Sequence, residues 1–225
     1  LWVADMEIQS PKAVRDALIE RVNHGVFGYG RVEDSYYDAF FAWQKEHHGM
    51  DLAKENVRFA TGVVGSLYAA VRSYTKEGDS VIICSPVYYP FYDAILNAGR
   101  KLVTCELDNH EGYYTLDLAK FEKEIADNDV KMFILCSPHN PVSRVWTEEE
   151  LAGMFDICKK HGVLVLSDEI HQDFVYGDHK FISSSIVKGG AYKDILILLN
   201  AGSKTFNLAG LIHSHVIIFN EDLMK

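Results

Sequence analysis

The stretch ILILLNAGSKTFNLAGL, residues 195–211, decides how we interpret this chain. It begins with Ile195–Leu199, a continuous apolar run of the kind found in strands that are buried on both faces of a parallel sheet. Lys204 follows this run, between a glycine-containing approach and an apolar exit. A lysine at the end of a buried strand is a candidate for Schiff-base chemistry with a carbonyl, because desolvation favours its neutral, nucleophilic form.

Apolar runs alternate with helical patterns along most of the sequence. We expect strands at residues 57–60, 80–85, 101–106, 131–137, 163–167, 195–199 and 215–219. Helices are expected at about 11–25, 34–48, 91–97, 116–126 and 147–161, with one more that follows Thr61–Ser66 and ends near residue 76. Such alternation predicts an α/β fold, a mostly parallel sheet with helices on both faces.

Two details of the helices follow from local sequence. Ser10 is expected to cap the first helix, whose apolar face is formed by Val14, Leu18 and Val22. Thr147 and Glu150 have the spacing of a capping box, which predicts a helix start at this point.

The composition restricts the kind of protein. The chain has 225 residues, 48% of them hydrophobic, and a net charge of −10, which predicts a soluble globular protein and argues against a nucleic-acid partner. No apolar run is long enough to span a bilayer, and the first residues do not resemble a signal peptide. The cysteines are scattered and form no Cys-x-x-Cys pair, so we expect reduced thiols and a cytoplasmic location; they are Cys84, Cys105, Cys136 and Cys158.

Polar loops follow five of the predicted strands. Their sequences are TGVVGS (61–66), SPVYY (85–89), SPHNP (137–141), SDEIH (167–171) and GSKTF (202–206). Because ligands of open parallel sheets bind beyond the carboxyl ends of the strands, we expect these loops to converge on one site.

Each loop also has a simpler explanation when it is taken alone. TGVVGS offers backbone N–H groups at a helix N-terminus, which suits a phosphate, but it could be a plain tight turn. Asp168 could pair with a buried cation or only cap the next turn. Asn140 could donate a hydrogen bond or only belong to a proline-stiffened turn, and Tyr88 could stack on a planar ligand or fill the core.

Together these groups describe a site for pyridoxal 5′-phosphate. Lys204 would bind the cofactor's aldehyde and move protons at the substrate Cα, and Asp168 would keep the pyridine nitrogen protonated. Asn140 would hydrogen-bond the ring 3-oxygen, and Tyr88 would stack on the ring. We count Lys204, Asp168 and Tyr88 as the catalytic residues, and no metal site is predicted.

The same motifs resemble fold-type I pyridoxal phosphate enzymes of the class I/II aminotransferase superfamily. WVADM, HGVFGY, SPHNP, SDEIHQDF and SKTFNLAGL together look like the cystathionine β-lyase-type C–S lyase branch. The resemblance implies that Gly62, Val63 and Val64 present phosphate-binding amides. It also implies that Tyr29 reaches the cofactor phosphate of a neighbouring subunit, so that a homodimer shares its sites.

Two further cofactor contacts follow from the resemblance. His171 stands where many relatives carry a tyrosine that contacts the ring 3-oxygen, and as a histidine it would titrate near neutral pH. Ser203 would lie next to the phosphate or the lysine.

Several positions depart from the pattern of the superfamily. Val142-Ser143 follow Asn140-Pro141, where many relatives have glycine. Ile212 stands where aminotransferases commonly carry a phosphate-binding arginine, which argues against transamination. The chain stops at Lys225, before the second, substrate-clamping domain that such enzymes have, so we divide it into an arm (1–30) and a truncated cofactor-binding domain (31–225).

These observations predict a pyridoxal phosphate-dependent C–S lyase that performs α,β-elimination. Its substrate would be a small amino acid, cystathionine or a cysteine S-conjugate, and its products a thiol, pyruvate and ammonia. Two alternatives remain open. One is an aminotransferase of the same superfamily, and the other is a cofactor-binding regulatory protein without catalysis.

Overall fold

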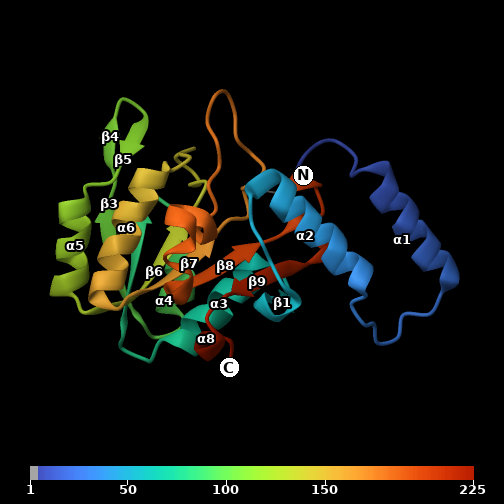
Figure 1. Cartoon of the computed structure of the whole chain (residues 1–225), viewed down its shortest axis with the longest axis horizontal. Coiled ribbons are helices and arrows are strands. Elements are labelled where there is room, and N and C mark those ends of the chain that lie inside the picture. Colours follow the sequence, from blue (N-terminus) through green and yellow to red (C-terminus); the bar gives the residue numbers. More distant parts are fainter. Residues whose placement is uncertain (1–4) are drawn as a thin grey trace.

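Seven strands form one sheet in the computed structural model, which describes residues 5–225 (Figure 1). Their order across the sheet is β1-β9-β8-β7-β6-β2-β3. The strands are β1 (Val57–Ala60), β2 (Ser80–Ser85), β3 (Lys101–Glu106), β6 (Val130–Cys136), β7 (Leu164–Asp168), β8 (Leu196–Asn200) and β9 (Ser214–Ile218). Residues 2–4 of the WVADM motif lie outside the described residues.

Only β9 runs against the common strand direction. It pairs antiparallel with both β8 and β1, and the remaining neighbours pair in parallel. The carboxyl ends of β1, β2, β6, β7 and β8 therefore lie at one edge of the sheet. The predicted mostly parallel sheet is confirmed, and its geometry brings the five polar loops to the same edge.

Helices cover both faces of the sheet (Figure 1). The helices α5 (Leu118–Asp127) and α6 (Glu148–His161) pack on one face, and α3 (Val63–Tyr74) and α4 (Pro90–Leu96) pack on the other. Strand β6 shows why both faces are dry, since its alternate side chains enter the two separate cores and are nearly all apolar. The predicted α/β architecture is confirmed.

Two helices begin or end where their sequences indicate. The Thr147 hydroxyl accepts a hydrogen bond from Glu150 N, and the Glu150 carboxylate accepts one from Thr147 N, so the predicted capping box starts α6. Helix α2 (Asp34–His48) ends at Gly49, whose φ of 66° is the left-handed conformation that glycine adopts without strain.

The core of the α6 face gives a direct stability prediction. Phe155 is fully buried on α6, and its ring centroid lies 5.4 Å from that of Tyr192. Phe155→Ala in the complete protein is expected to lower the free energy of unfolding by about 3–5 kcal/mol, because it removes buried surface and leaves a cavity. Lys160 is on the same helix as Phe155, and Lys160→Ala, which breaks an exposed ion pair with Glu122 of α5, should cost under ~1 kcal/mol. Urea denaturation measures both, and equal effects would contradict the prediction.

The prediction for the first helix, α1 (Lys12–His24), is wrong in two respects. Its N-cap is Pro11, and the Ser10 hydroxyl instead donates to Asn207 O at 2.9 Å. Among the residues of α1 none is buried, and Leu18 and Val22 on its predicted core face are exposed. The helix lies apart from the sheet in Figure 1, so its apolar face has no partner within the described part of this chain.

Two further features complete the fold. A hairpin of β4 (Asp108–His110) and β5 (Tyr113–Thr115), which the sequence analysis did not predict, extends beyond β3. A short helix, α8 (Glu221–Met224), begins near the end of the chain.

All four cysteines are buried and unbridged, as predicted. Between residues 5 and 225, no helix combines the length and the apolar character that a membrane crossing requires.

Candidate active site

A cavity of about 300 Å³ at the carboxyl edge of the sheet collects residues from all five polar loops. We call it the Lys204 cavity. Nine of the ten predicted site residues line it, namely Lys204, Asp168, Asn140, His171, Tyr88, Gly62, Val63, Val64 and Ser203. The tenth, Tyr29, does not. The convergence expected from the strand order is therefore present in the structure.

Lys204 lies in a single helical turn, α7 (Gly202–Thr205), that directly follows β8. This turn is closed by a hydrogen bond from Phe206 N to Gly202 O at 3.0 Å, and Leu208 N donates to Ser203 O at 2.8 Å. The lysine is partly buried, and its Nζ has no hydrogen bond or ion pair with any of residues 5–225. Its amine is therefore available to a ligand in the cavity.

Asp168 is the last residue of β7 and only 6% exposed. Its Oδ1 accepts a hydrogen bond from Ile170 N at 3.1 Å, so it does cap the next turn. Burial raises the pKa of Asp168 to about 7, because the ionised carboxylate loses its hydration; the Ile170 amide opposes this rise, Glu169 adds to it and Lys204 opposes it. A cationic group placed against this carboxylate would restore its ordinary ionisation.

The N-terminus of α3 borders the same cavity. Gly62 precedes the helix with a φ of 82°, a conformation that side chains rarely adopt, and it turns the chain from β1 into α3. Ser66 N is the first backbone amide of this region that has a hydrogen-bond acceptor, and it donates to Gly62 O at 3.1 Å. The N–H groups of residues 63–65 have no acceptor within the described part of the chain. Together with the helix dipole, they form an anion-binding arrangement.

Asn140 and Tyr88 approach the cavity from the loops after β6 and β2. Asn140 N donates to Cys136 Sγ at 3.3 Å, which holds the loop while its side-chain amide stays in the cavity wall. Tyr88 is half-buried, and its ring centroid lies 5.2 Å from that of Tyr89. Burial raises the pKa of Tyr88, so its hydroxyl keeps its proton at neutral pH.

His171 lines the Lys204 cavity together with Asn140 and is partly buried. Burial lowers its pKa below the ordinary histidine value, and the positive charge of Lys204 lowers it further. We expected His171 to titrate near neutral pH, but its lowered pKa moves the titration to lower pH. The imidazole is therefore neutral at pH 7. A neutral imidazole can still donate one hydrogen bond.

The sequence analysis missed His213, which also lines the cavity. Its Nε2 lies 2.6 Å from the hydroxyl of Tyr36 and 3.2 Å from Nε2 of His215. His213 immediately precedes β9, and because β9 runs in the opposite direction its beginning lies at the carboxyl edge of the other strands. A prediction that considered only residues after strands could not include it.

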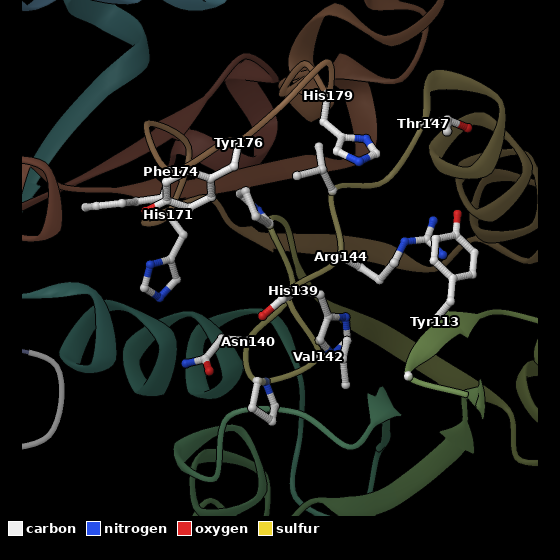
Figure 2. A pocket seen from close by; sticks show the side chains of 15 residues that line it. Tyr113, His139, Asn140, Val142, Arg144, Thr147, His171, Phe174, Tyr176 and His179 are labelled. Atoms are coloured by element: carbon white, nitrogen blue, oxygen red, sulfur yellow. The ribbon is translucent and has the colours of Figure 1, made fainter. Parts of the chain in front are cut away.

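A second cavity of about 530 Å³ adjoins the first and shares Asn140 and His171 with it (Figure 2). Its wall includes the aromatic and imidazole side chains of Tyr113, Phe174, Tyr176 and His179. Arg144 also lines it, but both oxygens of the Glu150 carboxylate lie 2.6 Å from Arg144 Nη2. The lining residues include no acidic side chain, and three histidines lie among them.

No group of three or more His, Cys, Asp and Glu side chains within residues 5–225 is arranged to hold a metal ion. The polar groups of the Lys204 cavity are an amine, a carboxylate, an amide, an imidazole and free backbone N–H groups. This set suits an anionic organic ligand that carries a basic nitrogen.

Comparison with known proteins identifies the family. The profile of the family "Aminotransferase class I and II" matches residues 3–218. The chain is 40% identical over 218 residues to cystathionine beta-lyase PatB of Bacillus subtilis, covering 97% of this chain and 56% of that protein. It is 35% identical over 219 residues to protein MalY of Escherichia coli, covering 97% and 55%.

Solved structures agree with this assignment. The PLP-bound C-S lyase from Staphylococcus hominis superposes with a TM-score of 0.95 at 37% identity, over 100% of this chain and 57% of that one. Cystalysin from Treponema denticola, which contains a pyridoxal 5′-phosphate cofactor, superposes with a TM-score of 0.94 at 40% identity, again over 100% and 57%.

The chain spans about half the length of the curated relatives it matches. Within that span the match is nearly continuous, and the resemblance to the cystathionine β-lyase-type branch, inferred from five motifs, is confirmed by the relatives found. The chain belongs to the aminotransferase class I and II family.

Proposed function

We propose that the complete protein is a pyridoxal phosphate-dependent C–S lyase. It performs α,β-elimination on cystathionine or a cysteine S-conjugate and releases a thiol, pyruvate and ammonia. The observation that carries the proposal is that Lys204, Asp168 and the N-terminus of α3 line one cavity. The names of the relatives, which include cystathionine beta-lyases and C–S lyases, support the same activity.

The groups around the cavity fit the three polar ends of pyridoxal phosphate. The amides of residues 63–65 lack an acceptor in the described part of the chain and would bind the phosphate. Asp168 is a buried carboxylate with no ion-pair partner among residues 5–225, and it would receive the ring nitrogen. Lys204 offers an amine without a partner there and would hold the aldehyde carbon.

The remaining lining residues position the ring. Asn140 and the neutral imidazole of His171 would donate hydrogen bonds to the ring 3-oxygen, and Tyr88 would pack on the ring face. Ser203, directly before Lys204, would contact the phosphate or the lysine. Each of these roles is a proposal that rests on the position of the residue in the cavity wall.

In the proposed reaction the bound cofactor supplies an electron sink for the charge left at the substrate Cα. Lys204 Nζ removes the Cα proton, and the carbon–sulfur bond at Cβ breaks with its electron pair leaving on sulfur as the thiolate. Asp168 would keep the ring nitrogen protonated, and so positively charged, throughout the reaction. The 2-aminoacrylate that remains reacts with water to give pyruvate and ammonia, and the thiolate takes up a proton.

The second cavity is the place for the substituent on the substrate sulfur. It adjoins the Lys204 cavity through Asn140 and His171, and Tyr113, Phe174 and Tyr176 contribute aromatic rings to its wall (Figure 2). A sulfur substituent that leaves from Cβ needs such a space next to the reacting carbon. The volume accommodates the distal part of cystathionine or an apolar thiol.

Transamination is the second candidate, because the family includes aminotransferases and an aspartate aminotransferase of Sulfolobus acidocaldarius is 32% identical over 179 residues. Ile212 argues against it. This residue lines the Lys204 cavity where aminotransferases of the superfamily commonly carry an arginine, and it holds a left-handed backbone with a φ of 48°. A regulatory protein that binds the cofactor without turnover is the third candidate, and only an assay separates it.

The arm formed by residues 1–30 is proposed to pack on a second copy of the chain. In its described part, Ile19, Val22 and Phe27 are each more than half exposed, which is unusual for apolar side chains without a partner surface. Tyr29 is fully exposed, and we propose that it reaches the cofactor phosphate of the partner. We propose a cytoplasmic homodimer with shared sites and the cofactor-binding domain at residues 31–225.

The proposal is tested with the complete protein, loaded with pyridoxal phosphate and given cystathionine without any keto acid. Thiol and pyruvate are expected together in equal amounts, because elimination needs no amino acceptor. Product that forms only after a keto acid is added would favour the aminotransferase. Cofactor that stays bound without product from cystathionine, S-benzylcysteine or amino donors would favour the regulatory protein.

A further inference from the structure

Glu169 is a fully buried acid that the proposed reaction does not use. It follows Asp168 directly in the loop SDEIH. Its backbone N–H donates to Leu199 O at 2.8 Å, so the residue is fixed between the ends of β7 and β8. Burial of an acid is costly, and its surroundings must compensate for the lost hydration.

Three donors converge on the Glu169 carboxylate. Ser184 N and the Ser167 hydroxyl donate to Oε1 at 2.8 and 3.2 Å, and the Ser183 hydroxyl donates to Oε2 at 2.8 Å. All three belong to the segment around β7 or to the start of the 3₁₀ segment Ser184–Gly190.

The serines behind these donors complete the network. Ser184 Oγ lies 2.9 Å from Ser167 Oγ, and Ser185 approaches Ser183 Oγ through its hydroxyl at 3.0 Å and its amide at 3.3 Å. The hydroxyls of Ser184 and Ser185 can therefore donate to those of Ser167 and Ser183. The Ser167 and Ser183 hydroxyls in turn donate to the Glu169 carboxylate. A neutral acid would need one of these donors to become an acceptor, so the network fits an ionised carboxylate.

Neither Glu169 nor Asp168 has a cationic partner within 4.0 Å among residues 5–225. Asp168 lines the Lys204 cavity, and Glu169, the next residue along the chain, is buried among serines outside the lining of that cavity. In a medium of low dielectric constant the combined charge of the two carboxylates attracts a cation placed in the cavity more strongly than one carboxylate does.

We propose that Glu169 is a positioning residue whose fixed negative charge, acting through Asp168, keeps the ring nitrogen of the bound cofactor protonated. The inference rests on the proposed function, because it concerns a cofactor with a basic ring nitrogen. Asp168 makes the contact, and the serine network holds the second charge where water cannot screen it. The electron-withdrawing strength of the ring then depends on both acids.

The other titratable groups near this pair are few. Lys204, His171, His213, Tyr88 and Cys136 line the cavity with Asp168, and the Glu169 carboxylate is surrounded by serines. Cys136 and Tyr88 keep their protons, since burial raises the pKa of both. Lys204 is thus the cation whose charge most directly opposes that of the two acids.

Two variants separate charge from structure at this position. Glu169→Gln removes the charge and keeps the length of the side chain. Glu169→Asp keeps the charge and is too short to keep all three hydrogen bonds. Glu149→Gln, an exposed charge removal on α6, is the matched control. All variants are made in the complete protein and prepared with and without pyridoxal phosphate labelled with 15N in the ring.

In the cofactor-free protein, carboxyl 13C NMR follows Asp168. Glu169→Gln is expected to lower the pKa of Asp168 by roughly one pH unit, a tenfold change in its proton affinity, whereas Glu169→Asp and Glu149→Gln leave it near wild type. In the loaded protein, the 15N shift should report a ring nitrogen that loses its proton at lower pH in Glu169→Gln alone.

Equal effects of the Gln and Asp variants, or no effect of Gln, would overturn the inference and leave Glu169 as a structural anchor. The wild-type protein gives a test that does not depend on how a variant folds. Its Glu169 carbon must have the shift of an ionised carboxylate at pH 8, and a neutral acid there refutes the proposal. Failure to take up the cofactor at all would instead count against the proposed function, because the cofactor-free measurements stand independently.

Discussion

Replacement of Lys204 by alanine is expected to lower kcat for α,β-elimination by roughly 10⁴-fold or more, because in the proposed reaction one amine both holds the cofactor and removes the Cα proton. Lys204 lies in the short helix after β8 and lines the cavity with an Nζ that has no partner among residues 5–225. The methyl group of alanine can perform neither of these two proposed roles.

The assay is pyruvate release by the complete protein with saturating cofactor and substrate. Borohydride should fix the cofactor to a peptide that contains residue 204 in the wild type and leave it removable in Lys204→Ala. Lys131→Ala, at the opposite edge of the sheet in an exposed ion pair with Asp129, is the control and should keep normal activity. Elimination that survives in Lys204→Ala would remove the residue from the mechanism.

Asp168→Asn is expected to reduce kcat by at least ~10²-fold, because the neutral amide can no longer hold a positive charge on the ring nitrogen. Asparagine has nearly the same shape and can still accept the hydrogen bond from Ile170 N, so the fold should persist. Absorption of the bound cofactor and the steady-state rate are measured together. Near-normal turnover with bound cofactor would show that the ring does not need this carboxylate.

The same variant has a consequence for stability. In the cofactor-free protein burial raises the pKa of Asp168 to about 7, well above the value in an unfolded chain. The stability linked to this group is fully present below pH ~4 and is lost as the pH rises through about 7, by up to roughly 4 kcal/mol. Urea denaturation between pH 4 and 8 should show this decline in the wild type and a flatter profile in Asp168→Asn.

Much of the sheet and of the cavity could be predicted because the relevant signals are local. Strands such as β2 and β8 are buried on both faces and read as unbroken apolar runs. Residues that follow parallel strands share one edge of the sheet, so the sequence alone is enough to group Asp168, Asn140 and Lys204. Their roles remain predictions.

Other features depend on partners far away in the sequence. The periodicity of α1 indicated an apolar face, but a helical pattern does not say which surface covers it, and the described part of this chain covers none of it. Ser10 has the residue type of a helix cap, yet Asn207, nearly two hundred residues later, provides its hydrogen-bond partner. His213 was missed because the direction of β9 is set by pairing and not by local sequence. Glu169 was missed because only burial distinguishes it from an ordinary loop acid.

The antiparallel pairing of β1 with β9 determines when the cavity can exist during synthesis. Val57 pairs with Ile217, so the first strand of the sheet must wait for nearly the last part of the chain described here. Contacts of such high sequence separation close slowly, because the entropy of a long loop is lost before they form. A nascent chain that has not yet extended past residue 218 therefore cannot hold β1, and the loop that follows it, in the sheet, and capture of the cofactor would mark the point at which residues 57–218 have finished folding.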